Sequence, residues 1–278
     1  MASSFSWKDE WLTAFKQLPH IAFDLDERII RSYWDDFALD YSNGVGRTSD
    51  LDMMVIDHLS EREIIRTGDR VLDIGCGTGN FSIPFASIAR EVDALDISAS
   101  MLNILRSRAS AEGCDNIIYT NERWETYEPG SSFDLVFSSF CPATCNLESV
   151  LKMESMSKGH CCILTMAPGS DRDIYSEVCG ELTGRGLSNR AYDAIMPMSV
   201  LHEMGREPEM RQFSIENGGR IDEQELERSL IGYVSCFIEI DDRQRDIIRE
   251  RVVRASREPR PERAKAAMIL WNSSSAIC

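Results

Sequence analysis

Three glycines at alternate positions, Gly75, Gly77 and Gly79, follow the apolar run 71–74 and precede a helical stretch. Gly75 permits a tight turn, and the missing side chains at Gly77 and Gly79 let a ligand touch the backbone. The N-terminus of the following helix adds free N–H donors. The segment predicts a small-molecule binding loop at the end of a strand.

Two aspartates near this loop help to select its ligand. Asp73 lies two residues ahead of the first glycine, where a carboxylate disfavours a pyrophosphate but suits an ammonium group. The loop also lacks the last glycine of the dinucleotide fingerprint G-x-G-x-x-G. Asp96 ends the apolar run 92–95, and a carboxylate there can accept both hydroxyls of a ribose. The pattern favours an adenosine that carries a methionine-like ammonium group.

Short β-branched runs alternate with amphipathic helical stretches from residue 70 onward. Strands are predicted at 71–74, 92–95, 116–120, 133–137 and 160–166, with helices at 80–90, 98–112 and 147–157. This alternation implies right-handed crossovers and a parallel sheet that is covered on both faces. The loop and Asp96 then lie at the same edge of the sheet.

The rest of the chain is less regular. Helices are predicted at 171–182, 199–205, 222–231 and 241–257, and strands at 210–215 and 266–271. Asp222 has the chemistry of an N-cap, with Glu225 three residues later. Residues 1–65 are rich in aromatic side chains and predict two helices, whose aromatic residues either form interface core or line a lid. We expect this extension to precede a domain over 66–278, with a variable substrate region at about 184–260.

The composition favours a soluble, cytoplasmic enzyme of small molecules. The formal net charge is -16 and the hydrophobic content is 43%. Such an acidic chain is handicapped in binding nucleic acid, because phosphates must be neutralised by Lys and Arg. No apolar run approaches the ~18 residues of a membrane span, and no apolar leader is present. The nine cysteines are expected to be free thiols.

Residues 72–79, Asp96 and the run 133–136 together resemble the first, second and fourth motifs of class I S-adenosylmethionine (SAM)-dependent methyltransferases. The resemblance implies an α/β fold with a Rossmann-like, mostly parallel, seven-stranded sheet and helices on both faces. N-terminal helices and a helical insertion near the C-terminal strands would be additions to this core. The resemblance further implies SAM as cofactor and S-adenosylhomocysteine (SAH) as product, but it says little about the acceptor.

The resemblance also assigns cofactor contacts. The backbones of Gly75, Cys76 and Gly77 would line the methionine end, in a loop that Gly79 completes. Asp73 would reach the ammonium group directly or through water. Asp96 would hold the ribose and Ile97 would lie against the adenine.

Two further segments carry less certain contacts in this family. Members of this family often have an acid after the third strand that accepts a hydrogen bond from the adenine. Here Arg123 stands at that position, with Trp124 beside it. Either Glu122 would take over the hydrogen bond, or the adenine would stack on Trp124. Ser139 opens the segment that should lie beneath the sulfonium. That segment has no Asn-Pro-Pro-Tyr run, which argues against amino-nucleobase chemistry.

No residue is marked as the catalytic group. Methyl transfer depends mainly on proximity and orientation, and a base is needed only for a poor nucleophile. His202, beside Glu203, is the least improbable base, although a surface role is the simpler interpretation. Methionines 196, 198, 204 and 210 either pack the core or line an apolar acceptor pocket.

No metal site is expected. Cys141 and Cys145 invite a metal or thiol-relay interpretation, but their spacing without a nearby His makes a poor zinc site. Cys161 and Cys162 should point to opposite faces of a strand, as core residues.

Four functions follow from this pattern. A small-molecule methyltransferase leads, and a protein or peptide methyltransferase is second. A non-catalytic SAM-binding module and an RNA methyltransferase are the remaining alternatives.

Overall fold

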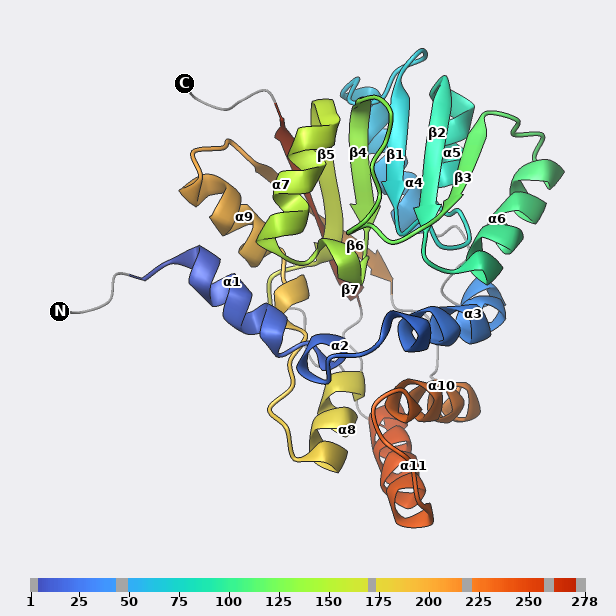
Figure 1. The fold of residues 1–278 in the computed structure, drawn as a ribbon, viewed down its shortest axis with the longest axis vertical. Coiled ribbons are helices and arrows are strands. Elements are labelled where there is room, and N and C mark those ends of the chain that lie inside the picture. Colours follow the sequence, from blue (N-terminus) through green and yellow to red (C-terminus); the bar gives the residue numbers. More distant parts are fainter. Residues whose placement is uncertain (1–4, 44–49, 170–173, 217–221, 258–262, 274–278) are drawn as a thin grey trace.

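The computed structural model describes residues 5–43, 50–169, 174–216, 222–257 and 263–273, and a seven-stranded sheet lies at their centre (Figure 1). The strands are β1 (Arg70–Ile74), β2 (Glu91–Asp96), β3 (Ile117–Asn121), β4 (Phe133–Ser139), β5 (Ser157–Met166), β6 (Glu209–Glu216) and β7 (Arg263–Asn272). Their order is β3-β2-β1-β4-β5-β7-β6, and β7 runs antiparallel to both of its neighbours. The predicted seven-stranded, mostly parallel sheet is confirmed.

Helices cover both faces of this sheet. The crossover helices are α5 (Ser82–Ile88), α6 (Ala99–Ala111) and α7 (Leu147–Met156). Ser98 caps α6 as predicted, by accepting the Met101 N–H at 3.1 Å. Pro84 is tolerated because it lies in the first turn of α5, where an N–H has no helical partner. Cys161 and Cys162 are both fully buried in separate core clusters, which confirms that they face opposite sides.

Four helices precede the sheet, where the sequence predicted two: α1 (Trp7–Lys16), α2 (Pro19–Ala22), α3 (Glu27–Asn43) and α4 (Asp50–Glu61). Pro19 starts a separate single turn, and Asp24 adopts a positive φ of 49° that interrupts the helical path. Helix α4 packs into the core on one face of the sheet. Helices α1–α3 (residues 7–43), which we call the N-terminal cover, lie across the edge where the parallel strands end (Figure 1).

The C-terminal half adds helices around the last strands. Helices α8 (Ile174–Thr183) and α9 (Ile195–Glu203) and the short turns η1 (Pro142–Thr144) and η2 (Arg190–Tyr192) follow β4 or β5, while α10 (Glu223–Ser235) and α11 (Asp242–Arg257) join β6 to β7. The predicted start of α8 at 171–173 lies outside the described residues. Helix α9 begins before the predicted residue 199 because Pro197 sits in its first turn. Asp222 caps α10 as predicted, by accepting the N–H groups of Gln224 and Glu225.

Helices α8, α10 and α11 share a small core of their own, which includes Val178, Leu230 and Ile248. They lie on the side of the N-terminal cover away from the sheet (Figure 1). Among the described residues, no helix has both the length and the apolar character needed to cross a bilayer.

Candidate functional site

The glycine loop between β1 and α5 is held by the neighbouring strand β2. The N–H groups of Gly75 and Cys76 both donate to the Leu95 carbonyl oxygen, at 2.8 and 3.0 Å. Gly75 and Gly77 line a cavity of about 470 Å³. A Cβ added at Gly77 (φ 53°) would lie 3.6 Å from the Tyr41 ring, so the absent side chain keeps the space between loop and ring open.

Gly79 and Cys76 do not line this cavity. A Cβ added at Gly79 (φ 91°) would lie 2.0 Å from Leu105 Cδ1, so this glycine lets α6 pack against the loop. The Cys76 side chain is buried in the core. Gly79 thus has a packing role, and Cys76 contributes a backbone hydrogen bond to β2, while the cofactor contacts expected of both residues stay predictions.

Asp96 ends β2 and faces the cavity. Its Oδ2 accepts the Gly77 N–H and its Oδ1 accepts the Ser98 N–H, both at 2.8 Å. Each carboxylate oxygen has a further lone pair with which to accept a hydroxyl of a ligand. Burial raises the pKa of Asp96 to about 6, although the two N–H groups act in the opposite direction.

Asp73 is buried behind the loop, outside the cavity lining. Its Oδ2 accepts the Ser82 hydroxyl at 2.5 Å, which places the carboxyl group at the start of α5. Burial raises the pKa of Asp73 to about 7, and the negative charge of Asp96 acts in the same direction. The Asp73 carboxyl group thus lies against the start of α5, and its contact with an ammonium group, direct or through water, stays a prediction.

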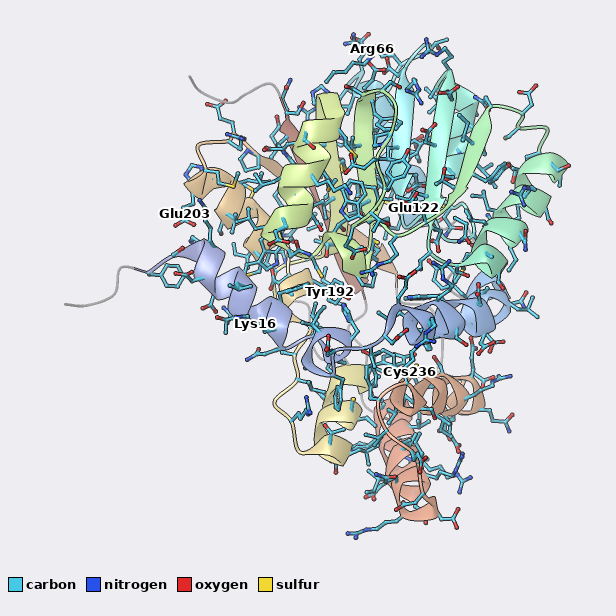
Figure 2. The ribbon with its side chains drawn as sticks, viewed as in Figure 1. Lys16, Arg66, Glu122, Tyr192, Glu203 and Cys236 are labelled. Atoms are coloured by element: carbon cyan, nitrogen blue, oxygen red, sulfur yellow. The ribbon has the colours of Figure 1, made fainter. Side chains whose placement is uncertain are left out.

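The N-terminal cover supplies one whole side of the cavity. Its lining residues, which come from α1, α2, α3 and the turn between α2 and α3, are Phe15, His20, Ile21, Asp24, Leu25, Glu27, Ile30, Trp34 and Tyr41. Figure 2 shows Glu122 at the edge of the sheet that faces α3. The sequence left open whether the aromatic residues of this extension form interface core or line a lid, and both kinds occur. Phe15, Trp34 and Tyr41 line the cavity, whereas Trp11 is a core residue.

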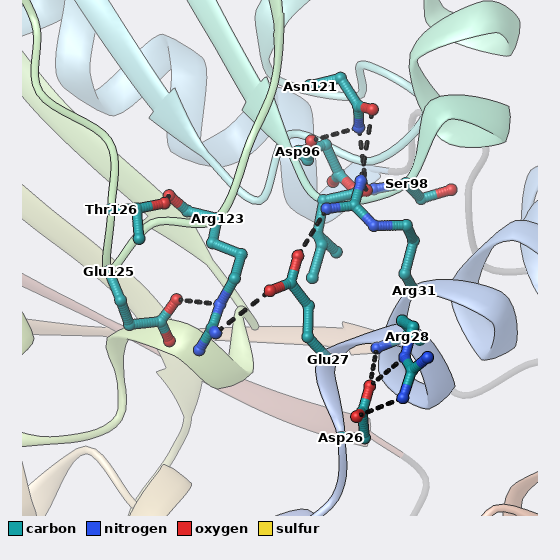
Figure 3. A network of polar contacts seen from close by, with 11 residues as sticks. Asp26, Glu27, Arg28, Arg31, Asp96, Ser98, Asn121, Arg123, Glu125 and Thr126 are labelled. Atoms are coloured by element: carbon teal, nitrogen blue, oxygen red, sulfur yellow. Dashed lines mark hydrogen bonds and ion pairs between the residues drawn. The ribbon is translucent and has the colours of Figure 1, made fainter.

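Polar contacts tie α3 of the cover to the ends of β2 and β3 (Figure 3). Arg31 donates to the Ile97 carbonyl oxygen at 2.6 Å and to Asn121 Oδ1 at 3.3 Å. Its other terminal nitrogen lies 2.8 Å from Glu27, which also contacts Arg123 at 3.3 Å. Because Ile97 and Arg123 line the cavity, this network fixes the cover directly onto the ligand-facing segments.

Asp35 makes a second attachment of α3. Its Oδ1 accepts the Ser98 hydroxyl at 2.6 Å and the Ser100 N–H at 2.9 Å. The start of α6 is therefore capped both by its own Ser98 and by a carboxylate from the cover.

Arg123 and Trp124 line the cavity, as does Glu122. The Arg123 guanidinium is paired with two carboxylates, because it contacts Glu125 at 3.2 Å as well as Glu27. Trp124 is 3% exposed, and the Lys152 ammonium lies 4.8 Å from its ring centroid. Its indole N–H has no hydrogen-bond acceptor in the part of the chain that the structure describes. Glu122 has the chemistry to accept an exocyclic amine, and Trp124 has a ring face for stacking.

The segment after β4 forms another wall, with Ser139, Phe140, Cys141 and Pro142 in the lining. Phe140 has a positive φ of 46° and is 44% exposed, while its N–H donates to Leu164 O at 2.8 Å. A non-glycine residue in this conformation is strained, and such strain is common at ligand sites.

The cysteines of this segment are protonated thiols at neutral pH. Burial raises the pKa of Cys141 to about 12 and raises that of Cys145 further. The Cys145 thiol lies 2.7 Å from the Pro142 carbonyl oxygen. Metal binding and nucleophilic attack require thiolates. Among the described residues, no group of three or more His, Cys, Asp and Glu side chains could hold a metal ion.

His202 and the methionine-rich segment lie elsewhere. His202 is exposed at the end of α9, outside the cavity lining, and Glu203 beside it accepts the Lys8 N–H at the start of α1 (Figure 2). Methionines 196, 198, 204 and 210 all belong to or pack against a core cluster. No described residue of the expected substrate region, 184–260, lines the cavity. That region instead supports the cover, for example where the Trp11 indole donates to Ala191 O at 3.1 Å.

His20 is a cavity residue to which the sequence gave no functional role. It lies on α2, a single turn that is too short to produce a periodic pattern in the sequence. Burial lowers the pKa of His20 to about 4, against the opposing charge of Glu125. The imidazole is therefore neutral at physiological pH.

Comparisons with known proteins agree with this geometry. Residues 71–154 match a family model described as a methyltransferase domain. A magnesium protoporphyrin IX methyltransferase from Synechocystis, solved with bound SAH, superposes with a TM-score of 0.56 over 88% of this chain and 98% of its own, at 14% identity. At that identity the likeness establishes the fold alone.

Curated relatives match over shorter segments. A probable cobalt-precorrin-6B C(15)-methyltransferase (decarboxylating) of Methanosarcina acetivorans is 33% identical over 32% of this chain and 50% of its own length. A 23S rRNA uracil methyltransferase of Xanthomonas oryzae is 32% identical over 30% of this chain and 19% of its own. The chain spans half or less of the length of the curated relatives it matches.

Proposed function

From the class I SAM-dependent methyltransferase domain that this chain carries, we propose that the protein transfers the methyl group of SAM to a small-molecule acceptor by in-line displacement. The observation that carries this proposal is the cavity of about 470 Å³ between the glycine loop, Asp96 and the N-terminal cover. Cavities of roughly 300–1,000 Å³ are typical of small-molecule sites.

The residues around the cavity suit SAM. Asp96 would hold the ribose, and the backbones of Gly75 and Gly77 would lie along the methionine part. Ile97 and Trp124 would flank the adenine, with Arg123 and Glu122 near its rim, and Ser139 would lie near the reacting end. When bound, SAM supplies an electrophilic methyl group on a good leaving group, so orientation by these residues provides much of the rate acceleration.

The charges around the cavity favour a neutral or cationic acceptor. Asp24, Glu27, Glu122 and Glu125 line it, against the cation of Arg123. The whole chain carries a formal charge of -16. A phosphate-rich acceptor such as RNA would be repelled both by the carboxylates of the cavity and by the net negative charge of the whole chain. The same acidity favours a basic peptide as the second candidate.

We also propose that the two parts of the chain have different roles. Residues 1–65 would act as a lid over a catalytic domain at 66–278. The free cysteines of the described part suit a reducing compartment such as the cytoplasm.

A calorimetric titration with SAH, compared between wild type and Asp96→Asn, tests cofactor binding. We expect the variant to bind about 10- to 100-fold more weakly, because hydrogen bonds to a charged group are worth ~1.5–3 kcal/mol. Wild-type affinity should fall below pH 6, since the pKa of free Asp96 is about 6 and ribose hydroxyls favour its charged form.

The same titration on Asp115→Asn, an exposed aspartate before β3, is the matched control. Equal affinity of Asp96→Asn and wild type would overturn the ribose assignment. An SAH-release assay over small amines, phenols, carboxylates, basic peptides and RNA then identifies the acceptor. Turnover of RNA or peptide alone would contradict the small-molecule proposal, and cofactor binding without any turnover would favour a non-catalytic module.

A further inference from the structure

His20 places an imidazole in the wall of the cavity. Its helix α2 begins at Pro19, and the Leu25 N–H donates to the His20 carbonyl oxygen at 3.1 Å, which fixes the backbone on both sides. Among the described residues, the imidazole itself has no hydrogen-bond partner, although it lines the cavity. This partly buried ring lines the cavity, so its nitrogens are available to a ligand there.

The surroundings of His20 form an apolar wall with a charged rim. Phe15, Ile21, Cys141 and Ala143 line the same cavity and pack against the same core cluster. The charged groups of the lining are Asp24 and Glu27 from the cover, Asp96 from β2, and Glu122, Arg123 and Glu125 from the segment after β3. Of these, Glu125 acts on the titration of His20, which burial nevertheless keeps neutral.

Several other titratable groups in the lining are poorly suited to accept a proton. Burial raises the pKa values of Tyr41 and Cys141 to about 12, so both hold their protons at neutral pH. Glu27 and Glu125 are paired with arginines. Asp96 accepts two backbone N–H groups. His20 is a neutral base with an available lone pair in the apolar part of the cavity.

We propose that His20 accepts the proton lost by the acceptor, and that the acceptor is a small, neutral or cationic molecule methylated on a hydroxyl group. This inference rests on the proposed methyltransferase function. A lone pair of the acceptor's hydroxyl oxygen forms the bond to the methyl carbon, and the electrons of the C–S bond stay on sulfur, which leaves neutral SAH. The proton of the acceptor passes to His20, and the resulting imidazolium, stabilised by Glu125, returns it to water.

Nuclear magnetic resonance of the imidazoles tests this proposal without turnover. The chain has only four histidines, so a spectrum of ¹⁵N-histidine-labelled protein can be assigned with His20→Gln. In the SAH complex, we expect the His20 signal to be that of a neutral ring between pH 6 and 8. Benzyl alcohol and benzylamine should shift it, whereas benzoate of the same size should not.

A protonated His20 at pH 7, or a His20 signal unmoved by both benzyl alcohol and benzylamine, would overturn its role. A benzoate shift equal to theirs would overturn the charge preference. Wild-type protein that binds no SAH would instead overturn the proposed function, so the two failures are distinguishable.

Turnover of any acceptor found in the SAH-release assay provides a second test. His20→Gln should lower kcat about 100-fold or more, the usual contribution of a general base, with SAH affinity changed less than about threefold. The rate of His20→Gln should rise with pH as the acceptor ionises, and imidazole should partly rescue His20→Ala. His58→Gln, on α4 away from the cavity, is the control. A kcat of His20→Gln within about threefold of wild type would contradict the role.

Discussion

Asp73 shows how a single buried carboxyl group makes the stability of the fold depend on pH. Burial raises its folded-state pKa from 3.8 to about 7. Between these values the folded chain binds more protons than the unfolded chain, so this group lowers the free energy of unfolding as pH rises from about 4 to 7. The protein without cofactor should therefore be more stable at pH 5 than at pH 8 as far as Asp73 is concerned.

Asp73→Asn should remove this penalty while its amide oxygen keeps the hydrogen bond from Ser82. We expect the variant to be more stable than wild type by about 1 kcal/mol or more at pH 8, since one pKa unit is worth ~1.4 kcal/mol. At pH 5 the difference should be smaller, because less of the penalty has developed at that pH. Urea unfolding at both pH values measures the difference, with the exposed Asp115→Asn as control. A variant that is less stable than wild type at pH 8 would show that the Asp73 carboxylate stabilises the loop.

The sequence predicted the residues of the sheet edge well and those of the cover poorly. Gly75, Gly77, Asp96, Ile97, Arg123, Trp124 and Ser139 all line the cavity. Their positions follow from strand ends, which short apolar runs mark clearly. His20 and Asp35 depend on how separate helices pack, and nothing in their local sequence encodes the distance to Glu125 or Ser98. The packing of Gly79 against Leu105 was not predictable, because a glycine needed for packing looks the same in sequence as a glycine needed for a ligand.

At the scale of elements, helix α3 holds the N-terminal cover against the end of β2 and the start of α6. Asp35 accepts two hydrogen bonds from the start of α6, at 2.6 and 2.9 Å. Asp35→Ala should weaken the attachment of α3 to the start of α6 by about 1–3 kcal/mol, the range for hydrogen bonds to a charged group. Release of bound SAH should become roughly 5- to 100-fold faster.

Stopped-flow displacement of SAH measures this rate, and hydrogen exchange should show faster opening of residues 27–43. Asp36→Ala, the exposed neighbour on the same helix, is the matched control. Unchanged release from Asp35→Ala would mean that SAH leaves by a route that does not require α3 to move.

Element boundaries were predictable wherever a cap or an apolar run defined them. Ser98 and Asp222 cap the helices that the sequence assigned to them. Helix α9 begins four residues before the predicted residue 199, and Pro197 fits within its first turn. The single turn α2 was missed because four residues cannot show a helical period.

At the scale of the whole molecule, the C-terminal helices support the cover from the side opposite the sheet. Tyr233 of α10 makes ring contacts with Tyr33 of α3 at 5.8 Å, with Tyr175 of α8 at 5.2 Å and with Phe237 at 5.0 Å. The region 184–260 thus contacts the N-terminal cover, and its role as a substrate region stays a prediction.

Tyr233→Ala should lower the free energy of unfolding by about 1–3 kcal/mol, because it removes a half-buried ring from three aromatic contacts. It should also weaken SAH binding, although no described residue of α10 lines the cavity. Tyr233→Phe keeps the ring and should lose less stability and less SAH affinity than Tyr233→Ala. Thermal unfolding and SAH titration measure the two effects. A loss of stability with unchanged SAH affinity would show that the cover holds its place without this support.

The position of β7 has a consequence for the order in which the chain is made. Residues 263–272 lie between β5 and β6, so β6 has no neighbour within the sheet until β7 has been synthesised. A nascent chain that has emerged only through α11 would expose the edge of β5 and an unpaired β6 together. Unpaired strand edges promote aggregation. We therefore expect completion of the sheet, and of the cavity at its edge, to follow release of residues 263–272 from the ribosome.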